Sequence, residues 1–226
     1  MTERVAVITG GLGALGAAVA AAARARGLRT AVIDSAPAPG ASDEAWVLAG
    51  VDLTDARQAG EAMAAVTSQF GRIDALLNIA GAFRWTTLED SDPDVWGLLF
   101  RINVQTAANA TRAALPALRA APAGRIVNVG ARAAERADAG MGPYAASKSG
   151  VHRLTESLAR ELEATAITVN AVLPSIIDTP QNRADMPSAD FDRWVKPTDL
   201  AEVILFLASD EARAVTGALV PVAGRI

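Results

Sequence analysis

Short apolar runs alternate along the whole chain with longer stretches of helical period. Such alternation is typical of repeated strand, crossover helix, strand units, which fold into a parallel sheet with helices on both faces. Runs of strand length lie at residues 5–9, 30–34, 46–51, 73–78, 125–129, 167–173 and 218–222. The sequence therefore predicts the α/β class, with a doubly wound parallel sheet of seven strands.

The stretches between these runs predict helices by their apolar period. They lie at residues 14–26, 55–70, 94–119, 144–163 and 197–208. A chain of 226 residues is long enough for one well-buried core of this class, so a single domain over residues 1–226 is expected. Within it, residues 178–195 are polar and rich in Pro, Asp and Asn, which predicts a long excursion that covers the substrate as a lid.

Composition excludes several kinds of site. The chain has no cysteine and a single histidine, His152, so we expect no metal centre. The net charge of -4 and the scattered basic residues give no reason to expect a nucleic-acid partner. No apolar run reaches the roughly 18 residues of a membrane span, and no leader precedes the first strand, so we expect no membrane association and a cytoplasmic location.

A glycine-rich turn closes the first apolar run and opens the first predicted helix. Gly11, Gly13 and Gly16 have the spacing G-x-G-x-x-G, which lets backbone amides and a helix N-terminus approach a pyrophosphate. This context predicts a Rossmann-type fold. Its dinucleotide site is expected to include Gly10, Gly11, Leu12, Gly13, Ala14, Leu15 and Gly16.

Asp34 ends the second apolar run, at the distance from the glycines where such folds place a ribose-binding carboxylate. A carboxylate there accepts hydrogen bonds from both adenine-ribose hydroxyls and repels a 2′-phosphate. NAD(H) is therefore the predicted cofactor, ahead of NADP(H). The alternative interpretation of Asp34 is a turn or cap residue before the prolines that follow it.

Tyr144 is the only tyrosine of the chain, and Lys148 follows it by four residues. This spacing places both side chains on one face of a helix, where the ammonium favours the phenolate and lowers the tyrosine pKa. The pair predicts a proton donor that works near neutral pH, and so a reduction. Between Thr111 and Tyr144 the chain has no serine or threonine that could hold a developing oxyanion.

With these motifs in order, the whole chain resembles the short-chain dehydrogenase/reductase family. Further matching pieces are Asp52-Leu53, Asn78-Ile-Ala-Gly81, Asn103 and Pro174. The resemblance implies that Tyr144 donates the proton, that Lys148 binds the nicotinamide ribose, and that Asn103 holds a water linked to the lysine. It also implies cofactor contacts from Asp52, Leu53, Asn78, Ala80, Gly81, Val129, Tyr144, Lys148, Pro174, Ser175, Ile177 and Thr179.

One departure from the family pattern concerns the substrate. The family's usual catalytic serine falls thirteen residues before the tyrosine, where this chain has Ala131, and loss of one oxyanion donor costs about 10²- to 10³-fold in rate. Arg132 or a water molecule is an alternative donor. The missing hydroxyl, together with residues 172–194, resembles the dihydropteridine reductases of this family, whose quinonoid substrate is a conjugated imine.

We therefore expect an NADH-dependent reductase that transfers hydride to a conjugated C=N or quinonoid small molecule. Two alternatives stay open: a ketone or alcohol oxidoreductase, similar to 3-oxoacyl reductases, that tolerates the missing serine, and a catalytically silent NAD(H)-binding regulator or scaffold. The resemblance also implies a homodimer or homotetramer through the helices at residues 94–119 and 144–163. The predicted substrate contacts are Phe83, Trp85, Ala131, Met141, Met186 and Trp194.

Overall fold

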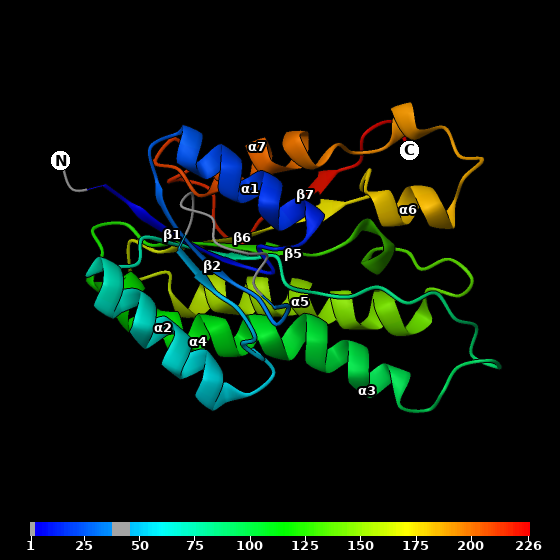
Figure 1. Ribbon diagram of the computed structural model, residues 1–226, viewed down its shortest axis with the longest axis horizontal. Helices are drawn as coiled ribbons and strands as arrows, with labels where there is room; N and C mark the ends of the chain where they lie inside the picture. Colours follow the sequence, from blue (N-terminus) through cyan, green and yellow to red (C-terminus); the bar gives the residue numbers. More distant parts are fainter. Residues whose placement is uncertain (1–2, 38–45) are drawn as a thin grey trace.

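The sheet of the computed structural model, which describes residues 3–37 and 46–226, is parallel between every pair of neighbouring strands (Figure 1). Within the described residues, its seven strands follow the order β3-β2-β1-β4-β5-β6-β7. They are β1 (Val5–Thr9), β2 (Arg29–Ile33), β3 (Trp46–Leu48), β4 (Ala75–Asn78), β5 (Arg125–Val129), β6 (Thr168–Pro174) and β7 (Leu219–Val222). This sheet confirms the predicted Rossmann-type fold, although β3 is shorter than the run predicted at residues 46–51.

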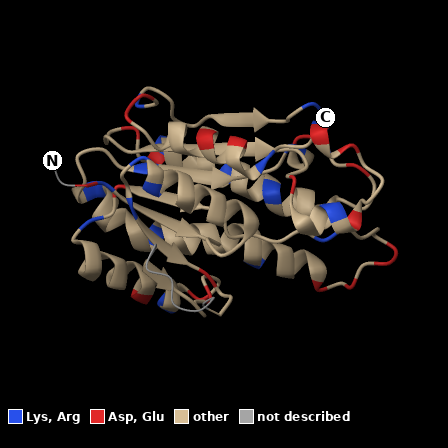
Figure 2. Cartoon of the chain, turned by 45° about the horizontal axis from the view of Figure 1, so that its top comes forward, with Lys and Arg blue, Asp and Glu red and all other residues tan. Residues whose placement is uncertain are grey.

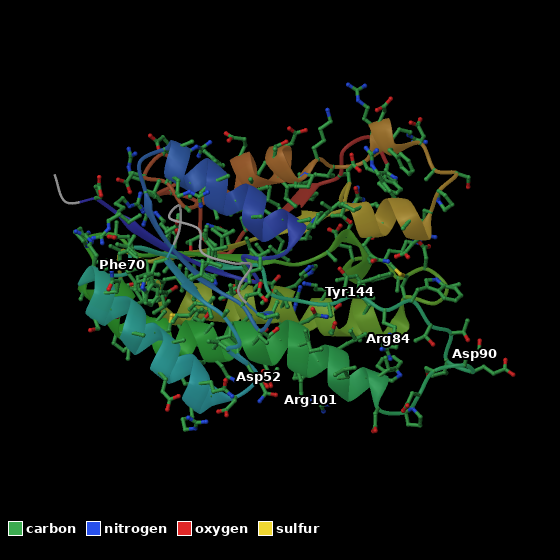
Figure 3. All side chains as sticks on the ribbon, in the orientation of Figure 1. Asp52, Phe70, Arg84, Asp90, Arg101 and Tyr144 are labelled. Carbon is green, nitrogen blue, oxygen red and sulfur yellow. The ribbon has the colours of Figure 1, made fainter. Side chains whose placement is uncertain are left out.

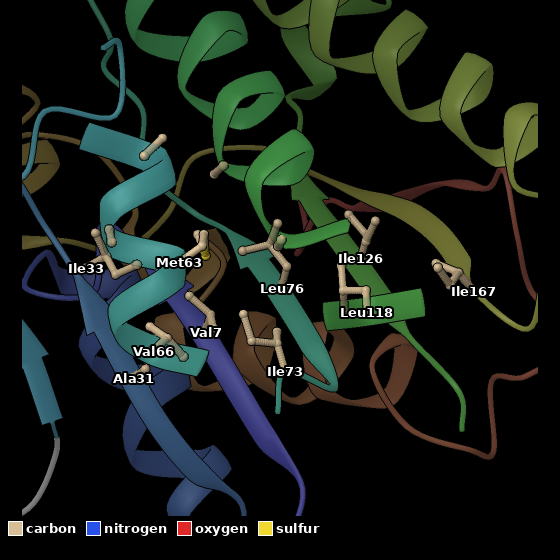
Figure 4. Close-up of a cluster of buried hydrophobic side chains, with 14 of the residues drawn as sticks. Val7, Ala31, Ile33, Met63, Val66, Ile73, Leu76, Leu118, Ile126 and Ile167 are labelled. Atoms are coloured by element: carbon tan, nitrogen blue, oxygen red, sulfur yellow. The ribbon is translucent and has the colours of Figure 1, made fainter. Parts of the chain in front are cut away.

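Helices cover both faces of the sheet (Figure 1). α1 (Ala14–Ala25) and α7 (Pro197–Leu207) pack on one face. The other face is covered by α2 (Ala56–Phe70), α4 (Thr106–Ala120) and α5 (Gly142–Glu161), and Figure 4 shows part of the core between them and the sheet. The short helices α3 (Val95–Phe100) and α6 (Pro180–Asp185) lie toward the carboxyl ends of the strands.

The central strands are buried because helices cover both of their faces. In β1, Val5 and Val7 belong to one core cluster, Ala6 and Ile8 belong to the other, and all four are fully buried. Burial of a valine or isoleucine side chain contributes about 1.5–3 kcal/mol. A strand that gains this on both faces reads in the sequence as a continuous apolar run, as observed here.

The helix predicted at residues 94–119 is present, but it is not α-helical throughout. A π-helical turn at Arg101–Gln105 joins α3 to α4. An extra residue in a helical turn rotates the side chains before it by about 100° relative to those after it. Within this turn Asn103 accepts a hydrogen bond from the Ala82 amide in the loop after β4, and in α4 Thr111 accepts one from Asn78 at the end of β4 at 3.1 Å.

Polar side chains link the two central strands to the helices that pack on them. Asn78 at the end of β4 donates to Asn128 of β5 at 2.9 Å, in addition to Thr111. Asn128 in turn donates to Thr155 of α5 at 2.9 Å. Because buried amides need such partners, these contacts fix α4 and α5 against the carboxyl ends of β4 and β5.

Charged side chains of both signs are distributed over the exposed loops and helix faces in the view of Figure 2. Among the residues that the structure describes, no helix is long and apolar enough to cross a membrane. The same part of the chain has no group of three or more His, Cys, Asp or Glu side chains placed to hold a metal ion.

Candidate active site

A cavity of about 1640 Å³ opens at the carboxyl ends of the strands. It lies where the strand order reverses between β1 and β4, which is the position at which open α/β sheets bind their ligands. The segments that follow β1, β4, β5 and β6 all contribute to its wall, through residues that include Gly10, Gly81, Ala131 and Ser175.

The turn after β1 leaves no room beside the backbone for a side chain at Gly10 or Gly16. Gly10 has a φ of 68°, and a Cβ there would lie 2.7 Å from the Cα of Ala80. A Cβ at Gly16 would collide with the carbonyl oxygen of Gly10. Gly13 is less constrained, since the nearest atom to such a Cβ would be the Gly10 oxygen at 3.5 Å. Gly10 and Gly16 therefore bring β1, α1 and the loop after β4 close together.

The start of α1 offers free backbone amides to the cavity. Gly13 is the N-cap, so the N–H groups of Ala14, Leu15 and Gly16 have no acceptor within the helix, and these three residues line the cavity. Amides at a helix N-terminus attract phosphate groups. The turn therefore fits the pyrophosphate of a dinucleotide.

Asp34 follows β2 and lines the same cavity. Its carboxylate oxygens accept hydrogen bonds from the Leu12 amide at 2.9 Å and from the Ala36 amide at 3.0 Å. Each oxygen keeps a second lone pair for a ligand. Asp34 thus ties the glycine turn to β2, a contact across 22 residues of sequence that no local pattern indicates.

Most of the other predicted cofactor contacts also line the cavity. They are Asp52, Leu53, Ala80, Gly81, Val129, Pro174, Ser175, Ile177 and Thr179. Asn78 and Gly11 do not belong to the cavity wall, and their predicted cofactor contacts stay predictions. The Asn78 amide is buried against Asn128 and Thr111, and Gly11 packs against Val32, whose Cγ1 would lie 2.6 Å from an added Cβ.

Tyr144 and Lys148 line the cavity from α5, as their spacing predicts. Figure 3 shows Tyr144 between Asp52 and the loop that carries Arg84 and Asp90. Burial raises the pKa of Tyr144 to about 12 and lowers the pKa of Lys148 to about 8. The expectation that the lysine lowers the tyrosine pKa is therefore corrected: burial disfavours the charged form of each side chain.

Asn103 holds the loop after β4 against α5. Its Nδ2 donates to the Ala82 carbonyl at 3.0 Å and to Ser147 Oγ at 2.9 Å, and its Oδ1 accepts from the Ala82 amide at 2.9 Å. An added Cβ at Gly81 would lie 2.7 Å from this Oδ1 and 3.3 Å from Lys148 Nζ. Asn103 therefore shapes the wall from behind, and its predicted water link to Lys148 stays a prediction.

Ala131 lies in the cavity wall at the position of the missing hydroxyl and is buried. Arg132 also lines the cavity, where its Nε lies 3.5 Å from a carboxylate oxygen of Glu135. His152 of α5 is buried behind Ala131 and accepts the hydrogen of its amide at 3.4 Å. The wall of the cavity thus contains a methyl group where the family pattern has a hydroxyl.

Three of the predicted substrate contacts, Phe83, Met141 and Met186, line the cavity with Ala131. The ring of Phe83 meets the ring of Tyr144 edge to face, with centroids 4.9 Å apart. Trp85 was predicted with them, but the structure places it outside the cavity wall.

Trp85 instead joins two loops on the rim of the cavity. Its Nε1 donates to the Ala139 carbonyl at 3.1 Å, and its ring packs so tightly on Gly140 that any Cβ there would overlap it. The Thr86 amide donates to the Gly140 carbonyl at 2.9 Å. These contacts hold the loop after β4 against the loop before α5.

Trp194 is also placed away from the cavity wall. It is buried and packs against Phe191, with ring centroids 4.8 Å apart. Both residues belong to the segment at 178–195 that was predicted as a lid. The two ends of this segment lie side by side, since Ile177 forms a parallel bridge with Val195.

Some residues of the cavity wall were not anticipated from the sequence. They include Ile102, Thr106, Arg136, Asn182 and Ile226. Ile226 reaches the cavity because the chain after β7 folds back onto Arg193, whose guanidinium donates to the Arg225 carbonyl at 2.8 Å. A contact of this kind leaves no periodic pattern in the sequence.

The model of the short chain dehydrogenase family matches residues 4–189. The chain belongs to this family. Membership, together with reductases among its relatives, makes the protein an NAD(P)-dependent oxidoreductase and accounts for the glycine turn, Tyr144 and Lys148 in one cavity.

Relatives of known activity in this family cover most of the chain. The cis-4-hydroxycyclohexanecarboxylate dehydrogenase of Sinomonas cyclohexanicum is 36% identical over 240 residues, 98% of this chain and 96% of its own. The acetoacetyl-CoA reductase of Shinella zoogloeoides is 31% identical over 235 residues, 98% of both chains. The 3-oxoacyl-(acyl-carrier-protein) reductase of Thermotoga maritima is 35% identical over 182 residues, 77% of this chain and 74% of its own.

Solved structures of the family show the same architecture. A carveol dehydrogenase from Mycobacterium avium in complex with NAD has a TM-score of 0.87 at 26% identity and covers 99% of this chain and 97% of its own. The ligand-free aldohexose dehydrogenase of Thermoplasma acidophilum has a TM-score of 0.90 at 24% identity, with 98% and 93% covered. The second likeness concerns the fold, and the first also supports a nicotinamide cofactor.

Proposed function

We propose that this protein transfers hydride between NAD(H) and the carbonyl carbon of a ketone, or in reverse the carbon of the matching secondary alcohol. The observation that carries the proposal is that Tyr144 and Lys148 line the same cavity as the glycine turn and Asp34. The relatives support it, because they are named as reductases of oxoacyl compounds and as a dehydrogenase of a hydroxylated ring. They favour this alternative over the conjugated-imine reaction expected from Ala131.

Tyr144 is the proposed proton donor to the substrate oxygen in the reduction. Its pKa of about 12 keeps the proton on the phenol at neutral pH. Lys148, with a pKa of about 8, is cationic at the same pH, and its charge favours the phenolate that remains after proton donation. When bound, the nicotinamide supplies the hydride.

The methyl group of Ala131 leaves Tyr144 as the direct donor to the substrate oxygen. We propose Arg132, or a water molecule, as the second donor. Arg132 lines the cavity, and its contact with Glu135 is between two half-exposed side chains. Exposed ion pairs of this kind contribute about 0–1 kcal/mol, so the guanidinium is free to exchange Glu135 for a substrate oxygen.

The preference for NAD(H) over NADP(H) rests on Asp34. Its carboxylate at the cavity rim would repel a 2′-phosphate, and the two residues that follow it, Ser35 and Ala36, carry no positive charge to offset this repulsion. The predicted choice of cofactor is therefore part of the proposal.

The experiment is turnover followed by NADH absorbance, with NADPH as control. The panel contains linear and cyclic ketones, 3-oxoacyl thioesters, cyclic secondary alcohols in the reverse direction and, as the competing class, cyclic imines and quinonoid dihydropterin. Turnover of a ketone or alcohol with preference for NAD(H) is expected. Turnover confined to imines would restore the first prediction, and NADH binding without any turnover would favour the silent regulator.

We further propose that the protein forms a dimer or tetramer through α3 and α5. Trp96 and Phe100 of α3 are 41% and 52% exposed despite their size, and Gly142 and Gly150 of α5 lie beside them. Exposed aromatic rings beside small residues suit close contact with a second copy. Sedimentation should give a dimer or tetramer that Phe100→Glu dissociates, whereas a monomeric wild type would overturn this proposal.

The cytoplasmic location stays a prediction.

A further inference from the structure

Two side chains of α5, one helical turn apart, hold the carboxyl end of β5. Lys148 Nζ donates to the Val129 carbonyl at 2.7 Å. The next residue on the same helix face, His152, accepts the hydrogen of the Ala131 amide on its Nε2 at 3.4 Å. Two consecutive turns of the helix therefore form hydrogen bonds with the two peptide groups on either side of Gly130.

His152 also packs directly on Gly130. A Cβ at this glycine would lie 2.5 Å from the histidine Nε2 and 2.8 Å from its Cδ2, which is closer than side chains approach each other. The imidazole is only 3% exposed. The ring thus occupies the space that a side chain at position 130 would need, and the two residues fit as a pair.

Gly130 and Ala131 are part of the cavity wall, whereas His152 is not. We propose that His152 is a positioning residue: its Nε2 fixes the Gly130–Ala131 turn and so sets the wall that faces the substrate where the family hydroxyl is missing. The inference rests on the proposed function for its effect on catalysis. It does not require His152 to touch the substrate or the cofactor.

The hydrogen bond to Ala131 exists only while Nε2 is unprotonated, since a neutral imidazole has one acceptor nitrogen and the cation has none. Burial lowers the pKa of His152, as do the positive charges of Arg153 and Lys148, while Glu135 and Glu156 oppose them. The acceptor is therefore present at neutral pH and lost in acid. The value of kcat should therefore fall at acid pH, where the imidazole gains a proton.

Three variants test this role. His152→Leu keeps the bulk of the side chain but has no acceptor, and kcat should fall at least about tenfold, as expected for a displaced wall, with NADH binding unchanged. His152→Gln keeps an acceptor that does not titrate, so it should restore most of kcat and lose the acid limb of the pH profile. Thermal melting of each variant checks that the fold persists.

Gly130→Ala provides the matched partner. Its methyl group should push the imidazole away and lower kcat as much as His152→Leu does. Both single variants disrupt the same contact between His152 and the Gly130–Ala131 turn. In the double variant Gly130→Ala/His152→Leu the fall in kcat should therefore be smaller than the sum of the two single effects, expressed as free energies. Additive losses, wild-type kcat in His152→Leu, or an acid limb that persists in His152→Gln would each overturn the proposal.

A readout that needs no turnover separates this inference from the proposed function. His152 is the only histidine of the chain, so its imidazole nitrogens give one set of ¹⁵N signals. We expect the Nδ1–H tautomer at neutral pH, with an unprotonated Nε2. If the protein shows this tautomer but turns over no substrate, the proposed function is wrong and the hydrogen bond to Ala131 stands. An Nε2–H tautomer would show that the hydrogen bond does not form.

Discussion

Strand β5 has a buried cation at each end, and the two have different surroundings. At its first residue, Arg125 is 2% exposed and donates to three backbone carbonyls at 2.9 to 3.2 Å and to Asp210 at 3.1 Å. Beside its last residue, Lys148 is 5% exposed, and its acceptor among the described residues is the Val129 carbonyl at 2.7 Å.

This difference shows that burial alone does not identify a functional charge. The guanidinium of Arg125 has five N–H donors and uses most of them within the fold, whereas the ammonium of Lys148 has three and keeps donors for a ligand. A buried cation with its donors satisfied stabilises the structure. A buried cation with donors left over, in the wall of a cavity, is available for chemistry.

The largest effect is expected from loss of the proposed proton donor, Tyr144, which lines the same cavity as Lys148. Tyr144→Phe removes only the hydroxyl, so kcat should fall by about 10²- to 10⁴-fold. The ring contact with Phe83 remains, so the melting temperature and NADH binding should stay near those of the wild type. A lowered melting temperature in this variant would show that Tyr144 acts through the fold, and loss of NADH binding alone would show that its hydroxyl contributes to cofactor binding.

Lys148→Met tests directly whether the two buried cations beside β5 differ in their roles. We expect kcat to fall by about 10²-fold or more, since the charge that favours the phenolate is removed. Stability should be equal or higher, because removal of a buried charge offsets the one hydrogen bond lost at the Val129 carbonyl. A destabilised Lys148→Met would place this lysine in the same class as Arg125.

The pH dependence of stability should also come from the Lys148 end. Folding lowers its pKa from 10.5 to about 8, so between these values the unfolded chain binds more protons than the folded one, and stability rises with pH. The gain is at most about 3 kcal/mol and is complete above the unfolded pKa. Denaturant melts at pH 7.5 and pH 9.5 should show a rise in the wild type that is smaller in Lys148→Met.

Arg125→Met gives the smallest expected effect, and the effect is on stability. Removal of the guanidinium leaves buried carbonyls without donors, which costs about 1–3 kcal/mol in the free energy of unfolding. Urea unfolding measures this loss. Below the melting temperature kcat should equal that of the wild type, and a large fall in kcat would break the distinction between the two ends of β5.

The features predicted correctly from the sequence are those with a local pattern. The glycine spacing around Gly13 predicts the turn, and the four-residue step from Tyr144 to Lys148 predicts one helix face; both residues line the cavity from α5. Asp34 lies at the end of a continuous apolar run, so its place beside the cavity follows from the strand. In each case the element that carries the residue also sets its direction.

The residues that the structure places away from the cavity wall, and the shifted pKa of Tyr144, depend on contacts and burial that arise only in the folded molecule. Trp85 is held by a loop 54 residues further along the chain, and Asn78 turns toward β5 and α4. The pKa of Tyr144 was expected to fall because Lys148 is one turn away, but burial, a property of the packed molecule, raises it. The four-residue spacing shows that the two side chains lie near each other, but it does not show how deeply they are buried.

The π-helical turn at Arg101–Gln105 makes the long helix unusually tolerant of a change in length. A π turn contains one residue more than an α turn, so deletion of one residue there would leave a regular helix. α4 could then keep its place against the sheet, while Asn103 would rotate by about 100° and release Ala82. One lost codon at this point would alter the cavity wall and turn the buried side chains of α3, while α4 keeps its packing.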